Sequence, residues 1–339
     1  MTLKFSILDL CPIPADQTPG QAIENSVALA REAEALGFHR YWLAEHHNTM
    51  MLACSVPELL ITRVAGATSR IRVGAGGIML PNHSALHVAE SFRVLEAMFP
   101  GRIDLGIGRA PGTDNRTAMA LRRDVGAGEE DVIVQLSDLV GYFADTMPHG
   151  HRFESVGAAP MGIQMPPVWM LGTSFFGAQA AAANGFGFAF AHHISPGPAL
   201  EAMRLYRETF RPSPFGDKPH AMISLHVLCA EEQEEADELA RIADLALINV
   251  MTNRNRSRFP TRAEALAYEF TPEQEERRPT RVGRIKAGTP DMLRDYILEI
   301  AEKSQADEII LNALVGEHEA RLKSYRLLAK ALGLDPAQP

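Results

Sequence analysis

The sequence predicts a single (β/α)8 barrel, and three observations lead to that prediction. The chain has 339 residues, which is enough for one domain of barrel size. Short β-like runs alternate with longer runs of helical periodicity along its whole length. Eight such pairs can be counted, and eight βα units favour a closed barrel over an open doubly wound sheet.

The first pair of elements shows how each one is justified. Residues 4–10 form an apolar run of strand length. Thr18 then offers a helix cap, Pro19 suits the first helical position, and Gln21 completes a capping box. Apolar residues recur at helical spacing from there to Gly37, where a glycine favours the end of a helix.

The same reasoning applies to the remaining elements. The strands that follow are expected at residues 40–45, 72–80, 102–108, 167–171, 187–191, 221–230 and 308–314. The helices that follow are expected at residues 56–69, 84–98, 128–146, 175–185, 198–211, 231–248, 290–304 and 317–332.

Two segments interrupt this alternation. Residues 249–288 form an insertion before the last strand, rich in Arg, Asn, Pro and Glu, and residues 148–167 form a second irregular stretch. Long irregular segments in a compact domain usually act as lids, interface elements or mobile loops. The sequence holds no internal repeat, so we expect residues 1–339 to form one domain with an insertion.

Composition limits the function classes. A formal net charge of −9 disfavours nucleic acid as the main partner, because phosphate binding requires a basic surface. No apolar run is long enough for a membrane span, and the first residues lack a secretory signal, so we expect a cytoplasmic protein. Cys11, Cys54 and Cys229 are far apart, which argues against disulfides and a structural zinc site.

Polar residues stand where several predicted strands end, and the active site of such a barrel lies at the carboxyl ends of its strands. Glu45, His46 and His47 end the second strand. Adjacent side chains of a strand point to opposite faces, so the two histidines cannot easily share one metal ion, and we expect no metal. General acid/base catalysis and simple hydrogen bonding at the barrel mouth both remain open for this pair.

Two further strand ends carry groups suited to an anion. Arg109 directly follows the fourth strand, where its planar guanidinium could bind a phosphate or carboxylate or form a structural salt bridge at the rim. Gly172, Thr173 and Ser174 end the fifth strand and begin a helix, whose free N–H groups favour an anion. Thr and Ser also cap most helices, so this second signal is weak by itself.

The third strand contains an unusual pair of glycines, Gly76 and Gly77, within the run VGAGGIMLP. Glycine weakens a strand unless a bulge or a close backbone approach requires it. A bulge is therefore expected here, with another group lying against these two residues. The run is not a dinucleotide-binding motif, because the third glycine and the following acidic residue are missing.

Together, four motifs resemble the bacterial luciferase-like flavin monooxygenases over residues 4–333. The motifs are EHH after the second strand, VGAGGIMLP, GRIDLGIGR, and GTS before an alanine-rich helix. Each alone has low specificity, but the four in this order and at these strand positions are specific. The resemblance implies a (β/α)8 barrel, reduced FMN as the cofactor, and a homodimer or a related heterodimer.

The resemblance also implies roles for particular residues. Ala75, Gly76 and Gly77 match the cofactor-binding strand, where the family has a non-proline cis peptide beneath the flavin ring. Arg109, with Gly172, Thr173 and Ser174, matches the phosphate site, and His46 matches the catalytic histidine beside the flavin. If His46 points into the barrel mouth, strand alternation directs His47 toward the helices and makes Glu45 a partner at the barrel rim.

This sequence departs from the luciferases themselves at two positions. Gly108 stands where they have a reactive cysteine, and the loop after the fifth strand lacks their acidic residue. Light emission and a long-chain aldehyde substrate are therefore not expected, and the sequence is more similar to other oxidoreductases of the family.

The activity that the resemblance implies is a monooxygenase reaction. A separate NAD(P)H-dependent reductase would supply reduced FMN, which reacts with O2 to give a C4a-hydroperoxyflavin that oxygenates a small organic substrate. The alternatives are an F420-dependent oxidoreductase on the same barrel and a non-catalytic flavin-binding protein. The substrate pocket is expected near Cys11, Asn48, Met50 and His193 and the 249–288 insertion, and His192 is a further candidate.

Overall fold

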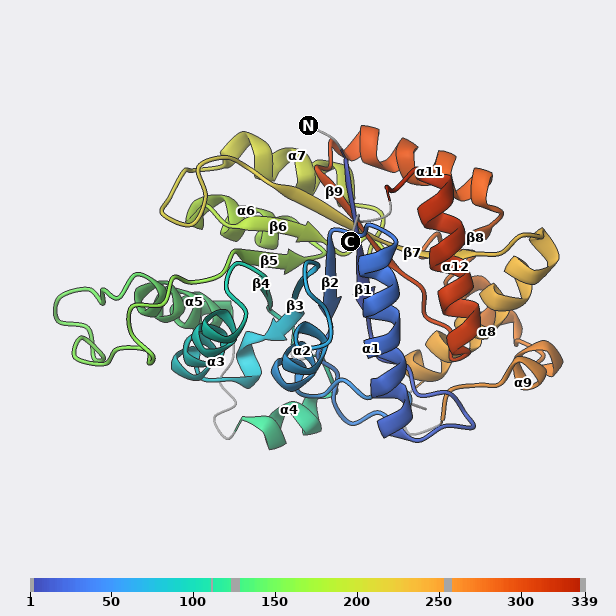
Figure 1. Ribbon diagram of the computed structural model, residues 1–339, viewed down its shortest axis with the longest axis horizontal. Helices are drawn as coiled ribbons and strands as arrows, with labels where there is room; N and C mark the ends of the chain where they lie inside the picture. Colours follow the sequence, from blue (N-terminus) through green and yellow to red (C-terminus); the bar gives the residue numbers. More distant parts are fainter. Residues whose placement is uncertain (1–2, 111, 123–128, 253–257, 336–339) are drawn as a thin grey trace.

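The computed structural model describes residues 3–110, 112–122, 129–252 and 258–335. Eight parallel strands in these residues close into a barrel surrounded by helices (Figure 1). The barrel strands are β1 (Lys4–Asp9), β2 (Arg40–Leu43), β3 (Arg72–Met79), β4 (Ile103–Gly108), β5 (Val168–Gly172), β6 (Gly187–Phe190), β7 (Ala221–Cys229) and β9 (Glu308–Asn312). The predicted fold and the eight predicted strands are confirmed.

The register of the strands closes the barrel in sequence order. Each strand pairs with the next, β6 pairs with β7, and β9 lies between β7 and β1. Because all of these pairings are parallel, the carboxyl ends of the eight strands meet at one end of the barrel.

The helices around the barrel also agree with the periodicity of the sequence. They are α1 (Pro19–Ala35), α2 (Pro57–Ala65), α3 (Ala85–Met98), α5 (Glu129–Phe143), α6 (Phe175–Asn184), α7 (Ala199–Thr209), α8 (Gln233–Met251), α11 (Pro290–Ser304) and α12 (His318–Ala331). The capping box predicted at Thr18 and Gln21 is present.

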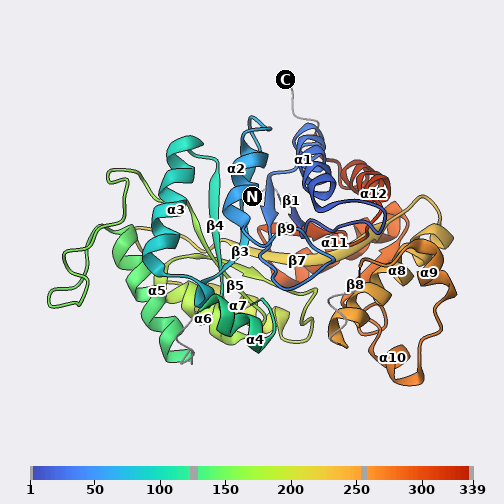
Figure 2. The same ribbon diagram turned by 90° about the horizontal axis from the view of Figure 1, so that it is seen from below.

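The insertion before the last strand is present, but it is not irregular. It contains α9 (Arg262–Ala267), α10 (Pro272–Arg277) and β8 (Ile285–Gly288), and β8 lies outside the barrel because it pairs only with the end of β7. Figure 2 shows α8, α9 and α10 on the side of the molecule opposite the long loop after α5. Capping boxes at Thr261 and Thr271 begin the two short helices and were readable in the sequence.

Two more short elements were not expected from the sequence. The turn η1 (Leu80–Asn82) follows β3, and α4 (Asn115–Leu121) lies in the connection between β4 and α5. The stretch 148–167 contains neither helix nor strand, as predicted. No helix among the described residues is both long and apolar enough to cross a lipid bilayer.

Alternation along each strand divides the core into two parts. Outward-facing residues such as Ile7 and Tyr41 pack under the helices in one large cluster. Their neighbours Leu8 and Trp42 face inward and form a smaller cluster inside the barrel with Trp169 and other side chains.

Charged groups close the amino-terminal end of the barrel, below that inner cluster. The buried Arg40 donates from Nε to Glu308 at 2.7 Å and from Nη1 to Asp104 at 2.8 Å. Arg72 binds the second oxygen of Asp104 at 2.6 Å. Burial alone would raise the pKa of Glu308, but Arg40 reverses this and lowers it to about 2. The network fixes one end of the barrel, and the open end is left for ligands.

Candidate active site

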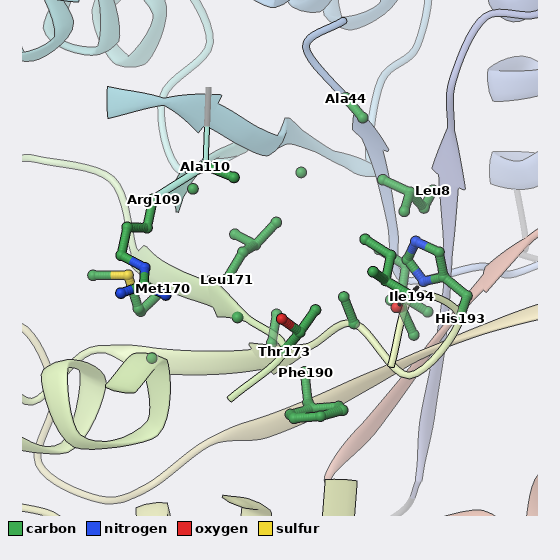
Figure 3. A pocket seen from close by; sticks show the side chains of 18 of the residues that line it. Leu8, Ala44, Arg109, Ala110, Met170, Leu171, Thr173, Phe190, His193 and Ile194 are labelled. Carbon is green, nitrogen blue, oxygen red and sulfur yellow. Dashed lines mark hydrogen bonds between the residues drawn. The ribbon is translucent and has the colours of Figure 1, made fainter. Parts of the chain in front are cut away.

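A cavity opens at the carboxyl ends of the barrel strands, and every one of the eight strands contributes to its wall. Figure 3 shows Arg109 at one end of this first cavity, His193 and Ile194 at the other, and Leu171 and Thr173 between them. Most of the wall is apolar, and its few polar groups are confined to particular places along it.

A second cavity of about 410 Å³ adjoins the first. Leu10 and His46 line both cavities, so the two meet at these side chains. The other walls of the second cavity come from the loops after β2 and β4, from α8, and from residues near β9.

The end of the first cavity at β4 and β5 carries groups suited to an anion. Arg109, Thr173 and Ser174 line it together, as the sequence predicted for neighbouring strand ends. The guanidinium carbon of Arg109 lies 4.6 Å from the centre of the Phe176 ring, which supports the side chain from one side. Ser174 is the N-cap residue of α6, and its hydroxyl makes no capping hydrogen bond.

The predicted irregularity in β3 is also present. The Gly76–Gly77 peptide is cis, and the register of β3 with β4 shifts between Ala75 and Ile78. Gly76 lines the first cavity. At Gly77, however, an added Cβ would lie 2.7 Å from the carbonyl oxygen of Gly106, so the neighbouring strand by itself requires a glycine there.

His46 lies where the two cavities meet. Its Nδ1 is 3.3 Å from the carbonyl oxygen of Ala44. A carbonyl can only accept, so Nδ1 of the neutral ring carries the proton and Nε2 keeps a lone pair. Burial lowers the pKa of His46 below 6.5, which keeps the imidazole neutral near neutral pH.

The prediction that His47 points toward the helices was wrong, because β2 ends at Leu43 and the alternation of the strand does not continue to residue 47. His47 lines the second cavity instead. Its Nε2 lies 2.7 Å from a carboxylate oxygen of Glu45, which is fully buried.

Glu45 connects the end of β2 to the end of β3. Besides His47, it accepts the N–H of Met79 at 2.7 Å and the amide of Asn82 at 3.0 Å, and it pairs with Nε2 of His83 at 3.0 Å. Burial alone would raise the pKa of Glu45, but the hydrogen bond from His83 is the largest of several contacts that lower it. We call these five residues the Glu45 cluster, and it holds Met79 at the wall of the first cavity.

His193 supplies a second imidazole to the first cavity. Its Nδ1 lies 2.6 Å from the hydroxyl of Ser224, while the rest of the ring faces the cavity (Figure 3). Burial lowers the pKa of His193 to about 4, so this ring is also neutral near neutral pH.

The 249–288 insertion lines the second cavity as predicted, through Val250 and Phe259, but the other residues predicted for the substrate pocket line neither cavity. Cys11 is fully buried and its thiol donates to the carbonyl oxygen of Ala22. Asn48 bonds Asp114 at 3.0 Å, Met50 is 58% exposed, and His192 is buried beside the cavity wall. In the described part of the chain, no three His, Cys, Asp or Glu side chains are arranged to hold a metal ion.

Sequence reasoning missed Ser224 and Phe176, although both left a signal. Ser224 lies two residues after Met222 in a largely apolar strand, so it shares the inner face of the barrel one step closer to the mouth. Phe176 follows the GTS motif within the first turn of α6. Tertiary contacts were needed to show that it lies beside Arg109.

Comparison with known proteins shows the family of this chain. Residues 3–308 match the luciferase-like monooxygenase family. The chain is 42% identical to the protein YvbT of Bacillus subtilis (96% of this chain, 95% of that protein) and 37% identical to a luciferase-like monooxygenase of Escherichia coli K12 (96% of each). It is 31% identical to N-acetyl-S-alkylcysteine monooxygenase of B. subtilis (97% of this chain, 98% of that protein). The chain belongs to the luciferase-like monooxygenase family.

Solved structures extend the comparison to cofactors. The structure of apo-MsnO8 superposes with a TM-score of 0.89 at 36% identity, over 99% of this chain and all of the other. The oxygenating component of 3,6-diketocamphane monooxygenase of Pseudomonas putida, in complex with FMN, gives 0.71 at 14% identity over 98% of each chain. An F420-dependent secondary alcohol dehydrogenase with an F420–acetone adduct gives 0.71 at 13%, over 98% of this chain and 99% of the other. The two distant structures share the fold and show that it accommodates either cofactor.

Proposed function

We propose that this protein binds reduced FMN in the first cavity and uses it with O2 to oxygenate a small organic substrate. One observation supports this most strongly: a group of anion-binding side chains at one end of an apolar cavity, with a neutral histidine beside that cavity. An amphiphilic ligand with one phosphate and one large aromatic ring matches this distribution.

The fit to FMN follows from the side chains. Arg109, Thr173 and Ser174 would hold the phosphate, helped by the free N–H groups at the start of α6. Leu8, Leu171 and other apolar side chains, with Gly76, would contact the ring. These assignments agree with those that the family resemblance implies for Gly76, Arg109 and residues 172–174. Ala75 and Gly77, which the resemblance also places at the cofactor, do not line the first cavity.

When bound, reduced FMN supplies the two electrons that split O2. One oxygen atom would enter the substrate, which gives up the other two electrons, and the second oxygen atom would leave as water. The role of His46 is to accept a hydrogen bond or a proton at Nε2, because its Nδ1 is occupied by Ala44.

The proposal includes partners. A separate NAD(P)H-dependent flavin reductase supplies the reduced FMN, because this sequence has no dinucleotide-binding motif. We also propose a cytoplasmic location and a homodimer, and size-exclusion chromatography with light scattering tests the homodimer directly.

The decisive experiment is an anaerobic titration with reduced FMN, followed by rapid mixing with oxygen while the visible spectrum is recorded. A monooxygenase should bind reduced FMN and delay the return of the oxidised spectrum relative to free flavin. Parallel titration with reduced F420 separates the alternative on the same barrel, since preferential F420 binding would replace the FMN proposal. Binding of FMN with reoxidation like that of free flavin would instead indicate a non-catalytic flavin-binding protein.

A further inference from the structure

We propose that the second cavity binds the organic substrate, and that this substrate is a neutral, largely apolar molecule. The inference rests on the proposed function, because it takes the first cavity to be the flavin site. It adds where the substrate lies and which chemical class it belongs to.

The position of the second cavity supports its assignment as the substrate site. The cavity is large enough for a small organic molecule and meets the first cavity only at Leu10 and His46 among its described lining residues. A molecule that fills it would therefore contact His46, the side chain proposed to act beside the flavin. Among the described residues, the two cavities share no other lining residue.

The chemistry of the cavity wall supports a neutral, largely apolar substrate. Leu52, Leu247, Phe259 and Leu314 are among a majority of apolar lining residues. The described lining residues include no Lys or Arg, and the only carboxylate among them is Asp114. A buried anion without a partner is strongly disfavoured, so this wall does not suit a carboxylate or sulfonate.

The polar groups of the cavity are largely occupied by the protein itself. Asp114 accepts hydrogen bonds from Asn48 and from the backbone at the start of α4, and the imidazole of His47 is paired with Glu45. Thr113 donates to the carbonyl oxygen of His47 at 3.4 Å. These contacts join the loops after β2 and β4 into one wall, and they leave little to hold a cation. The wall therefore offers hydrogen-bonding groups for at most one hydroxyl or carbonyl group of the substrate.

The test uses the FMN-loaded protein and three probes of the same shape: 2-phenylethanol, phenylacetate and phenethylamine. Binding is measured by calorimetry and by the change in the visible spectrum of bound FMN. The neutral alcohol should bind at least tenfold more tightly than either charged probe. Extension to 4-phenyl-1-butanol should tighten binding by roughly tenfold, since each buried methylene contributes about 0.8 kcal/mol.

Two variants test whether the alcohol binds in the second cavity. Leu247→Trp should fill it and weaken 2-phenylethanol binding at least tenfold, with FMN affinity unchanged within twofold. Met251→Trp is the matched control, because it places the same side chain on α8 at a 47% exposed residue outside the described cavity lining, and it should change neither affinity.

The outcomes separate this inference from the proposed function. Failure of the unmodified protein to bind reduced FMN in the anaerobic titration would refute the function. Normal FMN binding with no alcohol binding, with tighter binding of a charged probe, or with alcohol binding that Leu247→Trp leaves unchanged would overturn the substrate assignment alone.

Discussion

Arg109 is the residue whose role is most directly testable. It lies in the first cavity with Thr173 and Ser174, and Phe176 supports its guanidinium. A charge-assisted hydrogen bond contributes about 1.5–3 kcal/mol, so Arg109→Ala should weaken FMN binding by roughly ten- to a hundredfold. Riboflavin, which lacks the phosphate, should lose little affinity.

The control for this prediction is Arg116→Ala, which removes an exposed arginine from α4. Fluorescence titration with both flavins measures the effect. Equal weakening of FMN and riboflavin binding by Arg109→Ala would show that Arg109 is structural.

His46 is the second residue for which the geometry defines a test. General acid/base catalysis typically contributes about 10²–10⁴ in rate, so His46→Ala should slow oxygenation by that order while reduced FMN still binds. Burial lowers the pKa of His46, so an activity that needs its neutral form should fall only as the pH drops through a value below 6.5. Turnover rates of wild type, His46→Ala and His47→Ala across a pH series measure both the loss of rate and the pH dependence. Normal turnover by His46→Ala and loss by His47→Ala would transfer the role to His47.

The Glu45 cluster acts at the level of elements, because it joins the ends of β2 and β3. Glu45→Gln removes the charge that four donor groups surround, and hydrogen bonds to a charged group are worth about 1.5–3 kcal/mol. We expect a loss of about 2 kcal/mol in the free energy of unfolding, measured by denaturant titration.

The pH dependence of this loss follows from the two pKa shifts. Contact with Glu45 outweighs burial and raises the pKa of His83 above 6.5, so its contribution is complete below pH 6.5 and is lost as the pH rises through the raised pKa. Glu45 contributes fully above pH 4.5, and this is lost as the pH falls through its lowered pKa. The difference in the free energy of unfolding between wild type and Glu45→Gln should therefore be largest between pH 4.5 and pH 6.5. A pH-independent difference would contradict the ion-pair account.

For the whole molecule, the charged network at the amino-terminal end of the barrel is the critical feature. Arg40 joins Asp104 and Glu308 across strands that are distant in sequence. Arg40→Met should lower the free energy of unfolding by about 3–5 kcal/mol, because two buried carboxylates lose a partner. Arg294→Met, which breaks partly exposed pairs on α11, is the control and should change the free energy of unfolding far less.

The same network predicts the acid limit of the fold. The pKa of Glu308 is lowered to about 2, so its contribution is present above pH 4.5 and is lost as the pH falls toward 2. Acid titration of Arg40→Met should show a smaller slope over this range than wild type. Equal slopes would place the acid-sensitive groups elsewhere.

The sequence alone determined the barrel, because strand and helix periodicities and helix caps are local patterns. It also placed Arg109 and residues 172–174 at neighbouring strand ends, since parallel strands bring their carboxyl ends together. The irregularity at Gly76 and Gly77 was readable for a similar reason, because glycines interrupt an otherwise regular strand.

Tertiary structure decided what depends on where each strand stops and on contacts between distant segments. The alternation used for His47 failed because β2 ends at Leu43, and backbone beyond a strand no longer has a period of two. The pairing of His193 with Ser224, and the second cavity between the mouth loops and α8, join segments that are far apart in sequence. No local pattern encodes such distances, because packing of the closed barrel brings these side chains together.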